Sequence, residues 1–97
     1  MAGRIKITPD QMRSRAGEYR VQADAVHTVI DKMDQLLRYL QDEWEGASSQ
    51  AYAARFNELR PGFVNAESLI REIAQSLDTT AQTLESTDNQ IASQFKG

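Results

Sequence analysis

Apolar residues recur at a fixed spacing along the first half of the chain, alternately four and three positions apart. The positions are Met12, Ala16, Tyr19, Ala23, Val26, Ile30, Met33, Leu37, Leu40 and Trp44. This heptad spacing places them on one side of an α-helix and is typical of helices that pack lengthwise against others. Ahead of them, Thr8-Pro9-Asp10-Gln11 has the residues of a capping box, with proline at the first helical position. We therefore expect an extended leader at residues 1–7 and a first helix over residues 8–45.

The second half of the chain repeats the heptad spacing without a slip. Its positions are Tyr52, Phe56, Leu59, Phe63, Ala66, Ile70, Ile73, Leu77, Thr80, Leu84, Thr87 and Ile91. Pro61 falls inside this run, and an interior proline normally kinks or breaks a helix. A break would shift the phase of the pattern, whereas here the spacing continues through Pro61. The sequence therefore predicts one helix over residues 49–90, kinked near Pro61, and a tail over residues 91–97.

Trp44-Glu45-Gly46 lies between the two heptad runs. Gly46 suits the left-handed backbone conformation that commonly ends a helix, and Ser48 or Ser49 can cap the helix that follows. We expect the chain to turn at residues 46–48. The 97 residues then form one all-α domain (1–97), an antiparallel hairpin of two helices.

A single hairpin leaves apolar surface uncovered. Two helices of roughly 35–40 residues, each ~50–60 Å long, cannot bury both apolar runs against each other. A long exposed apolar strip usually marks an interface, and its simplest closure is a twofold dimer that forms a four-helix bundle. The residues expected to form the core and the dimer seam are Tyr19, Val26, Ile30, Met33, Leu37, Leu40, Phe56, Leu59, Phe63, Ile70, Ile73 and Leu77. A second hairpin of similar shape would cover the strip equally well, so homodimer and heterodimer both remain open.

Composition narrows the classes of function. The net charge is -3 at pH 7 and the basic residues are dispersed, which argues against nucleic acid as a partner. The chain has no cysteine and one histidine, His27, and it contains no metal-ligand spacing, no catalytic Ser/His/Asp set and no phosphate-binding loop. We expect no enzyme activity, no cofactor and no metal. Asp34 with Arg38 and Glu67 with Arg71 are interpreted as solvated i,i+4 pairs.

The sequence also lacks two common targeting signals. It has neither the apolar run of a secretory signal peptide nor the ~20 apolar residues of a membrane span. These rules keep the chain in the cytoplasm unless another export route reads it.

The length of about one hundred residues, the two heptad helices and the central Trp44-Glu45-Gly46 resemble the WXG family, the early-secreted-antigen-like substrates of type VII secretion. The chain is similar to the single-gene homodimer type of Gram-positive bacteria. The C-terminal region matches a second feature of that family, the export signal hydrophobic-x-x-x-Asp/Glu-x-x-hydrophobic-x-x-x-hydrophobic. The matching residues are Leu84, Asp88, Ile91 and Phe95. Leu84 stands where a narrower form of the signal has tyrosine.

The spacing of these four residues has a physical meaning of its own. Residues four, three and four positions apart share one face of a helix. An apolar face that carries one carboxylate near a chain end suits a receptor groove. Alternatively, Leu84 and Ile91 continue the apolar seam and Phe95 covers its end.

The resemblance implies a function and partners. Trp44 and Gly46 of one subunit would lie near the C-terminal signal of the other in an antiparallel dimer, and a membrane-anchored secretion ATPase would recognise both. The chain would be cytoplasmic before export and secreted without a signal peptide, as a substrate and also as a carrier or virulence effector. Two alternatives remain: a protein that permeabilises membranes after its dimer opens, which the acidic charge does not favour, and a cytoplasmic coiled-coil scaffold.

Overall fold

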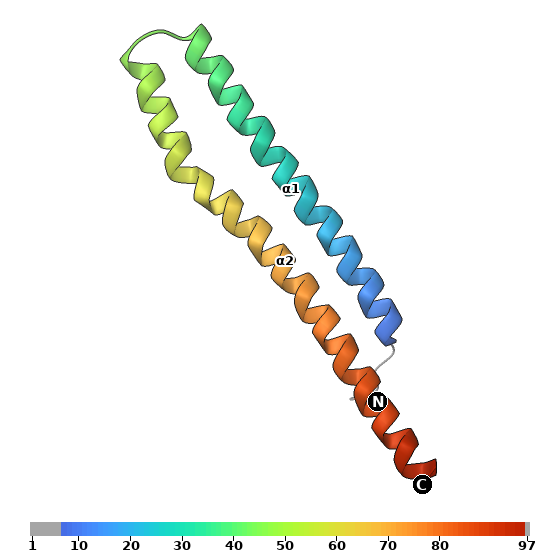
Figure 1. Ribbon diagram of the computed structural model, residues 1–97. Coiled ribbons are helices and arrows are strands. Elements are labelled where there is room, and N and C mark those ends of the chain that lie inside the picture. Colours follow the sequence, from blue (N-terminus) through green and yellow to red (C-terminus); the bar gives the residue numbers. More distant parts are fainter. Residues whose placement is uncertain (1–6, 97) are drawn as a thin grey trace.

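The computed structural model describes the backbone of residues 7–96 and the side chains of residues 7–89. It contains two helices, α1 (Pro9–Glu43) and α2 (Ala47–Lys96). They run antiparallel and lie side by side as a hairpin (Figure 1). The Cα atoms fill a slender rod of 77 × 23 × 20 Å. The expected all-α antiparallel hairpin is confirmed.

The start of α1 follows the predicted capping box. The Thr8 hydroxyl accepts a hydrogen bond from the Gln11 N–H at 3.1 Å, and the Gln11 side-chain oxygen accepts one from the Thr8 N–H at 2.8 Å. Pro9 occupies the first turn, where its missing N–H costs no hydrogen bond. The helix therefore begins at Pro9, as the sequence indicates.

The turn lies earlier in the chain than predicted. Helix α1 ends at Glu43, and Trp44 is its extended C-cap (φ −119°, ψ 106°), whose N–H donates to the Leu40 carbonyl at 2.9 Å. Gly46 has φ +113°, a conformation that favours glycine and lets the chain reverse within three residues. Helix α2 consequently begins at Ala47. The predicted boundaries of 45 for the first helix and 46–48 for the turn are wrong, and Ser48 and Ser49 lie inside the first turn of α2 instead of capping it.

Helix α2 is continuous through Pro61, as predicted. Proline has no N–H to donate to the carbonyl four residues earlier, so a bend is expected there. Figure 1 shows the axis of α2 changing direction in the yellow segment around this residue. The unbroken heptad spacing across Pro61 therefore correctly predicted one continuous helix.

The predicted tail at residues 91–97 is also wrong, because the backbone stays helical to Lys96. Adding residues to an existing helix costs far less than starting one. Threonines near the end of the run are accommodated within the helix: the Thr83 and Thr87 hydroxyls each donate to the carbonyl four residues earlier, at 3.0 Å. As a result α2 extends well past the start of α1 (Figure 1).

Small side chains fill the space between the helices. Four alanines, Ala16 and Ala23 of α1 and Ala74 and Ala81 of α2, are 0% exposed. The two backbones therefore approach closely in the half of the rod that is away from the turn. Met12, Ile30 and Ala53 complete the buried apolar set among the described residues. The core is therefore a line of mostly alanines and not the larger residues that the heptad pattern suggested.

Most of the predicted seam residues are left incompletely covered. Ile30 is buried. Those that are partly buried are Val26, Met33, Leu37, Leu40, Phe56, Ile70 and Leu77. Those that are exposed are Tyr19, Leu59, Phe63 and Ile73.

Candidate recognition and interface surfaces

Trp44 lies at the turn, just beyond the last helical residue of α1. Its side chain is 38% exposed. Across the turn, its ring meets that of Tyr52 in the second turn of α2, with centroids 5.8 Å apart and planes tilted by 47°. The sequence placed Trp44 inside the helix as its last seam position, whereas the structure places it outside. The tryptophan of the motif is thus a surface residue that contacts α2.

The predicted C-terminal strip lies at the other end of the rod. Leu84 is partly buried and Asp88 is exposed. Ile91 and Phe95 belong to the helical backbone of α2, but their side chains lie outside the described residues. The turn and the end of α2 are at opposite ends of the hairpin (Figure 1). One chain therefore does not bring Trp44 and Gly46 together with Leu84 and Asp88.

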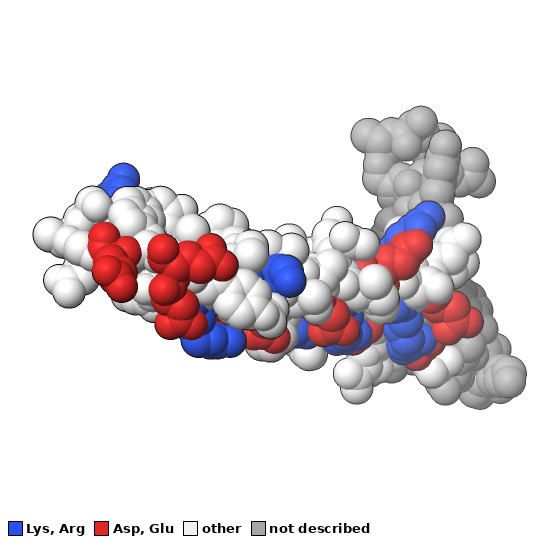
Figure 2. Space-filling model, turned by 90° about the horizontal axis from the view of Figure 1, so that it is seen from above, with Lys and Arg blue, Asp and Glu red and all other residues white. Residues whose placement is uncertain are grey.

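A row of ion pairs joins α1 and α2 along one edge. Arg13 donates to Glu85 through its two terminal guanidinium nitrogens, Nη1 and Nη2, at 2.6 and 2.7 Å. Arg60 also makes a bidentate contact, donating from Nε and Nη2 to the two carboxylate oxygens of Asp34, at 2.9 Å each. Between them, Arg20 pairs with Asp78 at 2.5 Å. Figure 2 shows basic and acidic side chains interleaved along this long edge.

The middle of this ionic edge is a cluster around the one histidine. His27 Nδ1 lies 3.0 Å from Glu67 Oε1 on the opposite helix, and His27 Nε2 lies 3.5 Å from Asp31 Oδ2. Arg71 contacts both Glu67, at 2.9 Å, and Asp24, at 3.0 Å. The hydrogen bond to Glu67 and the charge of Asp31 raise the pKa of His27. His27 and Arg71 in turn lower the pKa of Glu67.

The ionic edge was missed at the sequence level. Glu67 does pair with Arg71, but Asp34 pairs with Arg60 of α2 and not with Arg38 as expected. The signal that could have found it is the heptad spacing of polar residues beside the seam, at Arg13, Arg20, His27 and Asp34. In paired helices, such flanking positions form the interhelical ion pairs that set register.

The other side of the hairpin is apolar. Ala16, Ala23 and Ile30 face α2. At 3.6 residues per turn, the residues four positions after them lie on one side of that line and belong to the ionic edge. The residues three positions after them, Tyr19, Val26 and Met33, lie on the other side. Close to the turn between α1 and α2, this apolar face contains a groove of about 340 Å³. Its lining residues are Met33, Leu36, Leu37, Leu40, Tyr52, Phe56, Leu59 and Phe63.

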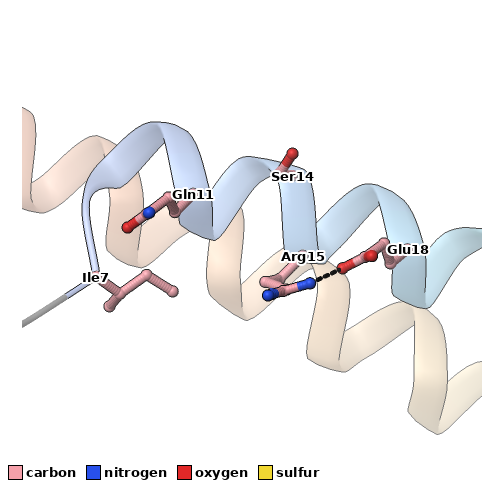
Figure 3. Close-up of a pocket in the computed structure, with 5 residues that line it drawn as sticks. All are labelled: Ile7, Gln11, Ser14, Arg15 and Glu18. Carbon is pink, nitrogen blue, oxygen red and sulfur yellow. Dashed lines mark hydrogen bonds and ion pairs between the residues drawn. The ribbon is translucent and has the colours of Figure 1, made fainter.

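A second hollow of about 440 Å³ lies beside the start of α1 (Figure 3). Its polar side chains are already engaged: Gln11 closes the capping box, and Arg15 binds Glu18 at 2.7 Å. Ser14 points away from Ile7 in this view. The hollow therefore does not assemble a nucleophile and a base.

The described residues hold no cluster of three or more histidine, cysteine, aspartate or glutamate side chains suited to a metal ion. Over the same part of the chain, neither helix is apolar enough over a sufficient length to cross a membrane.

Comparison with known proteins gives four consistent matches. A family model described as WXG100, proteins of 100 residues with WXG, matches residues 4–89. Protein YukE of Bacillus subtilis is 41% identical over 97 residues, with 100% of both chains covered. Type VII secretion system extracellular protein A of Staphylococcus aureus is 24% identical over 91 residues, with 94% of each chain covered. The crystal structure of Geobacillus thermodenitrificans EsxA has 43% identity and a TM-score of 0.81, covering 94% of this chain and 100% of that one.

Proposed function

The chain belongs to the WXG100 family, as its Trp44-Glu45-Gly46 turn and paired heptad runs predicted, and we propose that it is exported by a type VII secretion system as a non-enzymatic dimeric substrate. It would leave the cytoplasm without a signal peptide. Its receptor would be a membrane-anchored secretion ATPase. The related protein from S. aureus is named as a type VII secretion system extracellular protein, which supports the export route. A carrier or virulence-effector role rests on the family resemblance alone.

The observation that carries this proposal is the end of α2 that extends past α1. Among the residues whose side chains the structure describes, the last ion pair between the helices joins Glu85 to Arg13, and α2 continues to Lys96. Asp88, the acidic residue of the predicted signal, lies exposed on this extension. A helix end that projects from the bundle can enter a receptor groove without opening the rest of the fold.

A second copy of the chain is the partner that the hairpin's two sides favour. Ion pairs already satisfy one edge, whereas the opposite face exposes Tyr19, Leu59 and Phe63. A twofold dimer would cover that face and complete a four-helix bundle. If the two rods lie antiparallel, Trp44 of one copy comes near the C-terminal strip of the other. The recognition surface would then contain parts of both chains.

Export of a Trp44→Ala variant tests the recognition role. We expect a folded dimer whose amount in the culture medium falls about tenfold or more, because exposed aromatic residues act as interface anchors. The assay compares culture supernatants and cell lysates of the native host, with and without the secretion ATPase. Normal export of Trp44→Ala, or export that does not depend on the ATPase, would contradict the proposal.

One observation favours a different function. The apolar face that a dimer would cover is available to lipid if the dimer opens, so membrane permeabilisation is the second candidate. Leakage of dye from liposomes at neutral and acid pH separates it from a role confined to export. A cytoplasmic scaffold, the third reading of the sequence, predicts that the protein stays out of the medium.

A further inference from the structure

We propose that Tyr52, which lies outside the Trp-x-Gly motif, is a positioning residue that holds the Trp44 indole in the orientation recognised during export. This inference rests on the proposed recognition role of Trp44. It extends the recognition element from the turn into the second turn of α2, and it assigns a task to a side chain that the sequence pattern treats only as a seam position.

The backbone alone does little to orient the indole. Trp44 has left the helix and adopts an extended conformation, so the preceding turn of α1 does not restrict its side chain as it would a helical residue. Its side chain is 38% exposed. A large aromatic side chain at such a position needs a neighbour to fix it if a receptor is to bind it without first ordering it.

Tyr52 supplies that neighbour from a rigid element. The two rings lie 5.8 Å apart at a tilt of 47°, within the range in which aromatic pairs attract each other beyond simple burial. Tyr52 is held by the helical backbone of α2, and the positive φ of Gly46 returns the chain so that the two rings can meet. The three residues therefore divide the work: Gly46 reverses the chain, Tyr52 supports the ring, and Trp44 is presented.

Tyr52 also lines the apolar groove near the turn, so a test must separate support of Trp44 from a contribution to the dimer. Tyr52→Leu keeps apolar bulk in the groove but removes the aromatic face. Tyr52→Phe keeps the ring and removes only the hydroxyl. Tyr39→Leu is the matched control, because Tyr39 and Tyr52 are both 48% exposed and the Tyr39 hydroxyl accepts its hydrogen bond from Gln35 within α1.

The first measurement is intrinsic fluorescence, which reports on Trp44 alone because it is the only tryptophan in the chain. In Tyr52→Leu we expect emission shifted to longer wavelength and stronger quenching by acrylamide. Tyr52→Phe and Tyr39→Leu should match the wild type. Light scattering on the same samples should find the same oligomer for all four proteins.

The second measurement is export from the native host. Tyr52→Leu should reduce the secreted amount by roughly two- to tenfold, the factor that corresponds to the typical strength of an aromatic pair. Tyr52→Phe should restore export, and Tyr39→Leu should leave it unchanged.

Three results would overturn the inference. They are unchanged Trp44 fluorescence in Tyr52→Leu, loss of the dimer in that variant, or its normal export while Trp44→Ala is retained in the cells. The last result would leave the recognition role of Trp44 standing. Normal export of Trp44→Ala would instead remove the proposed function on which the inference depends.

Discussion

His27 faces a carboxylate on each helix, so we expect the stability of the hairpin to depend on pH through this residue. Its protonated ring can donate to Glu67 across the hairpin and also face Asp31, whereas the neutral ring has one N–H for these two carboxylates. Asp24 and Arg71 complete the charged surroundings from α1 and α2. Because the folded-state pKa of His27 is raised above its ordinary value of 6.5, its stabilising effect is complete below that value and is lost as pH rises through the folded-state pKa.

Thermal unfolding should therefore depend on this histidine in a defined range. We expect the melting temperature of the wild type to rise when the pH is lowered from about 8 to about 6, and that of His27→Gln to change less. The lowered pKa of Glu67 acts oppositely: its contribution is present above the ordinary value of 4.5 and is lost in stronger acid. Circular dichroism melts across this range provide the check, and parallel curves for the two proteins would rule out the effect.

At the scale of residues, the sequence predicted what depends on near neighbours and missed what depends on the far helix. The Thr8–Gln11 capping box and the need for glycine at position 46 involve residues three or fewer positions apart, and both are confirmed. The partner of Asp34 is Arg60, which only the fold brings close. The place of Trp44 outside α1 also depends on where the turn ends the helix, which heptad spacing cannot specify.

At the scale of helices, the close half of the hairpin depends on alanine. Ala74 is 0% exposed between α1 and α2, so a larger side chain there must push the helices apart. Ala74→Leu should destabilise the protein by about 1–3 kcal/mol through overpacking, which lowers the melting temperature by several degrees. Ala54→Leu, at an exposed position of the same helix, is the control. If the two variants melt together, the helices are not closely packed at Ala74.

The heptad pattern predicted both helices but not which of its members would be buried. In the first run, the buried members include the small residues Ala16 and Ala23, whereas the buried residues of α2, Ala53, Ala74 and Ala81, lie outside the predicted run. Larger residues such as Phe63 point toward the apolar face and are left exposed. Hydrophobicity alone ranks these positions in the reverse order, because burial depends on the distance between the helices and not on side-chain size.

At the scale of the whole molecule, the apolar face predicts the assembly. Light scattering should give twice the chain's 10.9 kDa. Phe63→Asp places a charge in the groove near the turn and should yield monomers, because an unpaired carboxylate in an apolar interface is costly. Val21→Asp is the control: Val21 is 61% exposed and lies two residues from buried Ala23, on the far side of α1. A dimeric Phe63→Asp would place the interface elsewhere.

The sequence predicted the family, and the comparisons confirm it. The identity of a partner for the apolar face is not encoded in the same way. An exposed apolar strip usually marks an interface, whereas the shape and charge of the surface that would cover it belong to another molecule. Trp44 and Asp88 could be related to each other only through the family resemblance. Trp44 caps the end of α1 at the turn and Asp88 lies near the end of α2, and these two parts are at opposite ends of a single hairpin (Figure 1).

The slender section of the hairpin has a consequence for translocation. Its Cα atoms occupy a cross-section of 23 × 20 Å along a length of 77 Å, so a pore wider than this cross-section by the reach of the side chains would admit the folded rod end-on. Passage would then require no melting of α1 from α2. A side-by-side pair of rods needs about twice the opening in one direction, so the diameter of the conduit would decide whether the protein crosses as one chain or as two.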